Sequence, residues 1–108
     1  MNIKKHNAVM LEITDAPNLD PILVVIREDS PRAARIIITC YSRSWTGYWG
    51  AMGSPIKRFF VDGSAGYLIG NLLCGMEFTS QKARAREEAY LTRIVEAVQA
   101  AFAQELAT

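Results

Sequence analysis

The sequence predicts an α+β fold, in which a meander of three or four antiparallel strands is followed by helices packed on one face of the sheet. Three observations indicate this fold. Apolar residues alternate in the first segment, two further strand-like segments follow after short loops, and the last quarter of the chain has helical periodicity. Residues 1–108 contain no linker, repeat or low-complexity tract, so we expect a single domain.

The first half of the chain supplies the predicted strands. Residues 8–14 alternate between apolar and polar side chains, which is typical of a half-buried strand. Residues 22–28 are apolar on both faces and rich in β-branched residues, which predicts a central strand, and residues 35–42 supply a third. Loops this short favour antiparallel pairing over crossover connections.

Residues 45–53, "WTGYWGAMG", predict either a fourth strand with a glycine bend or an irregular corner. If the third strand continues unbroken to Trp49, both tryptophans lie on the face opposite Ile36 and Ile38, as an exposed row. A bend near residues 42–44 or at Gly47 would turn them inward instead. A small domain needs large side chains for its core, so we expect at least one buried tryptophan.

The second half of the chain predicts helices. Ser54 and Pro55 have the types expected of an N-cap and a first helical residue, and residues 67–75 predict a short helix that ends at Gly75. Residues 80–106 predict one long helix, whose apolar stripe comprises Leu91, Ile94, Val95, Val98, Phe102 and Leu106. Alanines between these positions permit close helix approach and therefore a homodimer.

The composition excludes several classes of protein. The longest strongly apolar run, at residues 21–26, is too short to cross a bilayer, and no secretory signal is visible, so we expect a cytosolic protein. Cys40 and Cys74 lie in apolar segments, and we expect both to be buried free thiols. Only His6 could join them as a nitrogen ligand, and nothing has metal-site spacing, so we expect no metal and no cofactor.

Residues suited to catalysis are few, and we expect no enzymatic activity. His6 is the only histidine and lies in an N-terminal segment expected to be exposed. The adjacent acids at residues 28–29 and 87–88 are typical of solvated surface. The glycines at 47, 50 and 53 match no phosphate-binding motif, and Pro55 removes an amide that would bind an anion. A small-molecule enzyme would require a pocket around His6 or the scattered acids.

The charge distribution points to a binding surface. The net charge is +1, but residues 30–61 carry five basic and no acidic residues, and this stretch contains the aromatic cluster. Aromatic and basic side chains together suit the gripping of a protein partner or the stacking of bases. The predicted partner-binding residues are Arg43, Trp45, Tyr48, Trp49, Lys57 and Arg58, of which Arg43 and Tyr48 are the better surface candidates.

The segment "ITCYSRSWTGYWGAMGSPIKRFFVDGSAGYLIGNLL" resembles small accessory proteins of tailed bacteriophages and prophages. The shared order is a strand, a Ser/Ala–Trp step, an aromatic pair running into "GAMG", a helix with paired aromatics, and a Tyr-Leu segment. The matching positions are Ser44, Trp45, Tyr48, Trp49, Gly50, Ala51, Met52, Gly53, Phe59, Phe60, Tyr67 and Leu68. The resemblance covers about a third of the chain and implies an intracellular phage factor, without implying a mechanism.

These observations lead to two functional hypotheses. The first is a phage accessory protein in the host cytoplasm that binds a host protein or a defence complex, such as a CRISPR effector, without catalysis. The second is a nucleic-acid-binding protein that uses the acid-free residues 30–61. The second hypothesis predicts salt-sensitive affinity, because each phosphate contact releases counterions.

Overall fold

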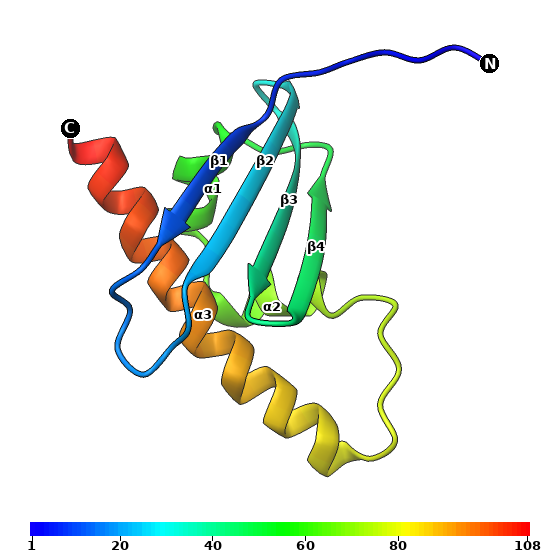
Figure 1. Cartoon of the computed structure of the whole chain (residues 1–108), viewed down its shortest axis with the longest axis vertical. Helices are drawn as coiled ribbons and strands as arrows, with labels where there is room; N and C mark the ends of the chain where they lie inside the picture. Colours follow the sequence, from blue (N-terminus) through cyan, green and yellow to red (C-terminus); the bar gives the residue numbers. More distant parts are fainter.

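The computed structural model describes all residues 1–108. The protein has two layers, a four-stranded sheet and three helices, and the helices lie behind the sheet in Figure 1. The strands pair antiparallel in the order β1-β2-β3-β4, and the long helix α3 comes last. The predicted α+β fold is therefore confirmed. The elements are β1 (Val9–Ile13), β2 (Ile22–Ser30), β3 (Ala33–Cys40), β4 (Arg43–Trp49), α1 (Ile56–Asp62), α2 (Ala65–Leu72) and α3 (Gln81–Ala107).

One hydrophobic core of 21 buried residues fills the space between the sheet and the helices. Because strand side chains alternate between faces, every second residue of β2, β3 and β4 points toward the helices. The helices meet them with Phe60, Leu72 and the stripe of α3 from Leu91 to Phe102. Full burial of one such side chain stabilises a fold by about 1.5–3 kcal/mol. Most of the stability therefore resides on this side of the sheet.

A two-residue hairpin separates β3 from β4. Cys40 is paired with Arg43, so only Tyr41 and Ser42 form the connection. Tyr41 has φ +57°, a conformation that two-residue hairpins require and that bulky L-residues rarely adopt. The chain therefore reverses direction after Cys40, and the third strand does not continue to Trp49.

This reversal decides where the tryptophans point. Trp45 is paired with Ile38 and Trp49 with Ala34, and directly paired residues share a face of the sheet. Both indoles consequently face the helices, with exposures of 2% and 6%. The expectation of at least one buried tryptophan is confirmed, and the exposed tryptophan row that an unbroken strand would create does not form.

Gly47 lies between the two tryptophans, where no side chain would fit. A Cβ atom added there would lie 2.8 Å from Cζ3 of Trp49 and 3.0 Å from Cδ2 of Leu72. The ring of Trp49 thus packs against the backbone of its own strand at Gly47. Leu72 of α2 lies close to the same position. Glycine is required here by close packing, since β4 remains a regular strand through this position.

The helix starts differ in detail from the predictions. Pro55 is the N-cap of α1 and Ser54 is not, so the predicted serine cap is wrong. α2 begins at Ala65, because Ser64 accepts a hydrogen bond from the Tyr67 N–H at 3.2 Å. It ends at Leu72, before Gly75, whose φ is +84°. α3 begins at Gln81, one residue after the predicted start, and Ser80 is its N-cap.

Two further expectations about burial are corrected. Cys40 and Cys74 are both free, but only Cys40 is buried, and Cys74 is exposed in the turn after α2. Leu106 is 40% exposed, so the buried stripe of α3 stops at Phe102. In Figure 1 the last turns of α3 reach past the edge of the sheet.

Candidate partner-binding surface

The sheet face opposite the helices is uncovered, and we call it the open face (Figure 1). Its side chains are those that alternate with the core residues along each strand. They are Met10, Glu12, Leu23, Val25, Arg27, Arg35, Ile37, Thr39, Ser44, Thr46 and Tyr48. This face is the largest continuous part of the sheet that no other element covers.

The middle of the open face is apolar. One row of side chains crosses all four strands, because Met10 is paired with Val25, Val25 with Ile37, and Ile37 with Thr46. Met10 is exposed, while Val25 and Ile37 are partly shielded by their neighbours. A solvated sheet face normally carries polar side chains at such positions. This row is therefore a candidate contact for an apolar partner surface.

A row of basic and aromatic residues borders the apolar middle. Arg27 is paired with Arg35, and Arg35 with Tyr48. The guanidinium carbon of Arg35 lies 5.6 Å from the centroid of the Tyr48 ring, within cation–π range. Arg27 forms an ion pair with Asp29 at 2.9 Å, whereas Arg35 has no acidic partner. The row thus offers one uncompensated positive charge beside a half-exposed phenol ring.

The predicted site residues do not form one surface. Tyr48 lies on the open face, while the structure moves Trp45 and Trp49 from the predicted partner surface into the core. Lys57 and Arg58 lie on α1, in the helical layer. The physical reason is strand alternation: Tyr48 and Trp49 are neighbours in the sequence and therefore point to opposite faces.

Arg43 belongs to a partly buried polar cluster with Glu87 and Trp45. The Glu87 carboxylate accepts hydrogen bonds from the Arg43 guanidinium and from Nε1 of Trp45, the latter at 2.9 Å. Glu87 is 4% exposed, so its assignment to solvated surface is wrong. The sequence contained a signal for the burial of Glu87, because this residue continues the helical spacing of Leu91, Ile94 and Val98 toward the N-terminus of α3. The cluster ties β4 to α3.

Tyr90 lies beside this cluster and is kept protonated. Its ring centroid is 5.8 Å from that of Trp45 and 5.5 Å from the Arg43 guanidinium carbon. The interaction with the Cys40 side chain and partial burial raise the pKa of Tyr90 to about 12. The phenol is neutral at physiological pH, as an ordinary tyrosine is, and the raised pKa affects the protein only in alkaline solution.

The acid-free segment of the sequence is not acid-free in space. Lys57 forms an ion pair with Glu105 at 3.4 Å and Arg58 with Asp62 at 3.7 Å, while Arg43 is held by Glu87. These acids come from outside residues 30–61. Only Arg32 and Arg35 of the five bases have no acidic partner. A strongly cationic stripe therefore does not form.

No group of three or more His, Cys, Asp or Glu side chains has the geometry to hold a metal ion. No helix is both long and apolar enough for a membrane crossing. A cavity of about 450 Å³ beside α3 is lined by Arg43, Glu77, Arg86 and Glu87, and its arginine and glutamate charges balance. A second cavity of about 440 Å³ separates β1 from α3.

Sequence reasoning missed Arg35, Val25 and Ile37 as surface residues. The pattern of residues 22–28, apolar on both faces, predicted a central strand, and β2 is indeed an inner strand of the sheet. Its second apolar face, however, meets no helix. That excess of apolar residues was the available signal for the open face, because a face left in water would not need it.

A comparison with known protein families gives a match over most of the chain. A family model described as a phage family matches residues 1–84, which include the four strands, α1, α2 and the first residues of α3. No curated protein and no solved structure matches the chain. The match confirms the phage association that the sequence resemblance implied, and it covers every residue of the open face.

Proposed function

Because the chain belongs to this phage family, we propose that it is an accessory protein that binds a host protein in the host cytoplasm and acts without catalysis. A bacterial defence complex, such as a CRISPR effector, is one target of this class. The observation that carries the proposal is the open face, an apolar row bordered by an arginine and a tyrosine on a rigid sheet.

The composition of the open face suits a protein partner. Tyrosine, methionine and arginine are enriched in protein interfaces, and tyrosine and arginine are frequent among the residues that dominate binding energy. Tyr48 and Met10 are 48% and 66% exposed, so both have surface to lose on binding. Their strands hold them in place, which lowers the entropy lost on association.

The charge of the open face indicates the chemistry of the partner. Arg35 has no acidic partner within the chain, and it stands beside the apolar row. A partner surface with a carboxylate next to an apolar group would complement both features. Arginine forms bidentate hydrogen bonds with carboxylates, so this contact would also orient the partner.

The nucleic-acid hypothesis has less support. Three of the five bases in residues 30–61 already face acids, and the indoles that could stack on bases are buried. A gel shift at low salt distinguishes the two hypotheses. A protein-binding role predicts no shift at micromolar protein, whereas nucleic-acid binding predicts a shift that weakens steeply as salt rises.

The proposal is tested by photo-crosslinking in infected cells. A photoreactive amino acid replaces Thr46, exposed on the open face in the edge strand β4 and paired with Ile37, and in a matched control it replaces Glu96, exposed on α3. We expect one discrete host-protein adduct from position 46 and none of that mass from position 96. Equal adducts from both positions, or none from position 46, would contradict docking through the open face.

Substitutions then measure the contribution of the basic and aromatic row. Arg35→Glu and Tyr48→Ala should each reduce capture of the cross-linked partner by about tenfold or more, as truncation of an interface hot spot does. Arg58→Glu makes the same charge change on α1 and should leave capture unchanged. If Arg58→Glu reduced capture as much as Arg35→Glu, a general charge effect would explain the binding.

A further inference from the structure

The edge of the sheet at β1 has no strand partner on its outer side. β1 pairs only with β2, so backbone N–H and C=O groups along its other side point away from the sheet. Its five residues include one charge, Glu12, and no proline, and the side chains of Val9 and Met10 are exposed. Natural proteins protect such edges with lysine, proline, a covering element or a short, charged strand, and β1 has only its short length and Glu12.

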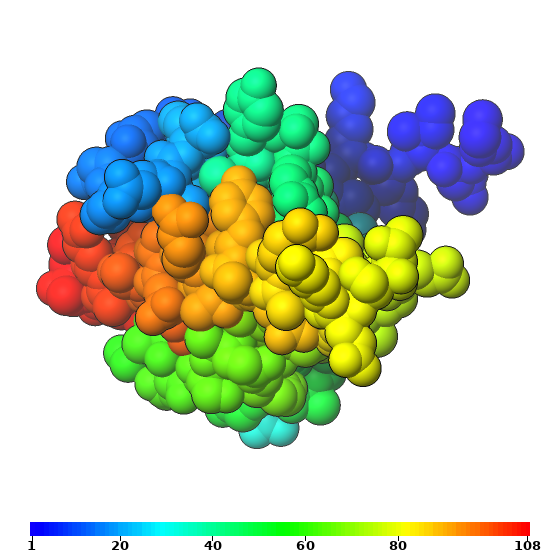
Figure 2. Space-filling view, turned by 90° about the horizontal axis from the view of Figure 1, so that it is seen from below, coloured from blue at the N-terminus to red at the C-terminus, as the bar shows by residue number.

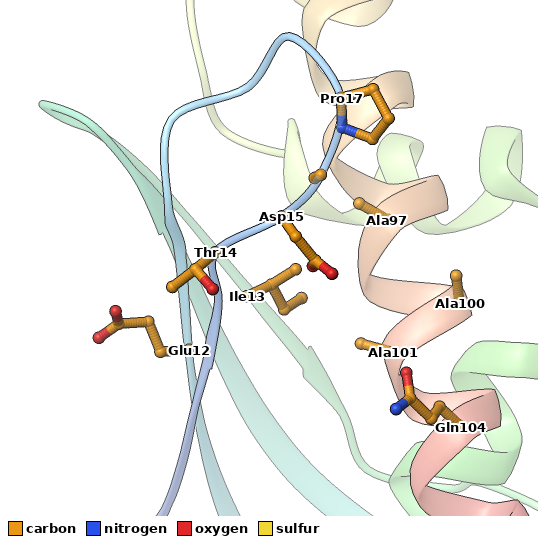
Figure 3. Close-up of a pocket in the computed structure, with 10 residues that line it drawn as sticks. Glu12, Ile13, Thr14, Asp15, Pro17, Ala97, Ala100, Ala101 and Gln104 are labelled. Carbon is orange, nitrogen blue, oxygen red and sulfur yellow. The ribbon is translucent and has the colours of Figure 1, made fainter.

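α3 extends beyond this edge and leaves a groove beside it. Its 27 residues span about 40 Å, and in Figure 1 its C-terminal turns pass behind β1 and emerge on the far side. The groove has a volume of about 440 Å³ and lies between residues 12–17 and the alanines of α3, Ala97, Ala100 and Ala101 (Figure 3). A second cavity of about 260 Å³ continues it and shares Ile13 and Ala101. The small alanine side chains leave this space open beside the end of β1.

We propose that this edge and groove bind a second copy of the chain, through antiparallel pairing of the two β1 strands centred on Leu11. Pairing about a two-fold axis is the commonest arrangement of homo-oligomers. A centre at Leu11 overlaps all five residues of each strand and places Met10 opposite Glu12 of the second copy. A centre at Glu12 would set two carboxylates directly opposite each other, which is destabilising.

The same pairing brings the N-terminal segment of the second copy, residues 1–8, to the groove. In a single chain this segment leaves β1 at Val9, and Figures 1 and 2 show it projecting from the body, away from the C-terminal turns of α3. Antiparallel strands run in opposite directions. The residues that precede β1 in the second copy therefore run past Ile13 of the first copy toward Asp15 of the first copy. The segment that is exposed in one chain thereby lies along the groove of the other.

The side chains of the segment fit the groove. With Leu11 at the centre, Asn7 of the second copy is opposite Asp15, and Lys5 follows on the same face. Diagonal neighbours of this kind are about 7–8 Å apart, within reach of a long lysine side chain. Asp15 is exposed and has no ion partner in the single chain. The charge complementarity of Lys5 and Asp15 therefore supports this register.

This dimer is independent of the proposed host partner, and it would enlarge the surface available to one. The two sheets would form a single eight-stranded sheet, with both open faces on the same side and Met10 of each copy at the junction. The tests below need only the purified chain. Their failure would leave host binding through the open face untouched.

Cysteine cross-linking tests the register. The variants carry Cys74→Ser, since Cys74 is exposed, while Cys40 is fully buried and stays in place. Under mild oxidation we expect a disulfide dimer from Leu11→Cys alone, or from Met10→Cys mixed with Glu12→Cys, because opposite residues have the Cα separation that a disulfide requires. Met10→Cys and Glu12→Cys tested singly are the matched controls. No cross-link from either expected pair, or faster cross-linking of a single control, would overturn the register.

Light scattering of the purified protein and a charge exchange test the groove. The wild type should have the mass of a dimer. Lys5→Asp and Asp15→Lys should each weaken dimerisation by about three- to tenfold, as expected when an exposed ion pair is lost and like charges meet. The double variant should restore most of the affinity, because the pair re-forms with its charges exchanged. A monomeric wild type, or no restoration in the double variant, would overturn the proposal.

Discussion

At the scale of single residues, Glu87 shows how one buried carboxylate can join a strand to a helix. It accepts hydrogen bonds from both Arg43 and Trp45, so the polar edge of a largely apolar indole is satisfied inside the core. No buried side-chain nitrogen or oxygen atom of the chain lacks a hydrogen-bond partner. Removal of this one group would leave the buried indole N–H of Trp45 without an acceptor, while the half-exposed Arg43 guanidinium can bond to water.

Glu87→Ala should therefore lower the free energy of unfolding by about 1–3 kcal/mol, the range for leaving one buried donor without an acceptor. Urea denaturation followed by tryptophan fluorescence measures the change. Glu88→Ala is the matched control, because Glu88 forms only an exposed ion pair with Arg84 and should cost about 0.5 kcal/mol or less. Equal losses for the two variants would mean that the buried cluster contributes no more than a surface pair.

Tyr90 provides a prediction about pH. Its pKa in the folded protein is about 12, above the usual value of 10.0, so the folded state holds the phenolic proton more tightly than the unfolded chain does. The associated stability is fully present below pH 10 and is lost as the pH rises toward 12. Urea midpoints measured between pH 9 and pH 11.5 should fall more steeply for the wild type than for Tyr90→Phe. Parallel curves for the two proteins would contradict the raised pKa.

At the scale of elements, β4 depends on the two-residue hairpin and on Gly47. The hairpin sets which face the tryptophans occupy, and the glycine lets the Trp49 ring pack against its own strand beneath α2. Both features concern backbone geometry rather than side-chain chemistry. The strand is thus held to the helical layer by packing along its length and by the Glu87 cluster at its start.

Gly47→Ala should destabilise the protein by about 1–3 kcal/mol, the usual cost of forcing an extra methyl group into a packed core. The added Cβ would lie within 3.0 Å of both Trp49 and Leu72, so neither can stay in place. Gly53→Ala is the control, because no atom lies within 4 Å of a Cβ there. Thermal unfolding compares the two variants, and a neutral Gly47→Ala would show that the Trp49 ring has room to move.

At the scale of the whole molecule, the two faces of the sheet have different roles. The face toward the helices contains the core, and the open face contributes little burial but presents Arg35, Tyr48 and an apolar row. Stability and partner binding should therefore respond to different substitutions, even at positions adjacent in the sequence.

The neighbouring residues Tyr48 and Trp49 test this separation directly. Trp49→Ala should cost about 3–5 kcal/mol, because it opens a cavity in the core, while Tyr48→Ala should cost about 1 kcal/mol or less, the value of an exposed cation–π pair. Chemical denaturation of both variants gives the comparison. A large loss of stability for Tyr48→Ala would place the open face within the folding core and weaken its role as a docking surface.

The sequence by itself determined the fold class, the strand meander and the long C-terminal helix. These follow from local periodicity, which reflects the backbone geometry of each element and needs no knowledge of its neighbours. The tertiary structure alone decided which way the tryptophans point and which acids meet the bases of residues 30–61. The number of residues in the turn between β3 and β4 decides which side chains of β4 face the helices. The ion pairs join residues far apart in the chain. Neither effect leaves a periodic signal in the sequence.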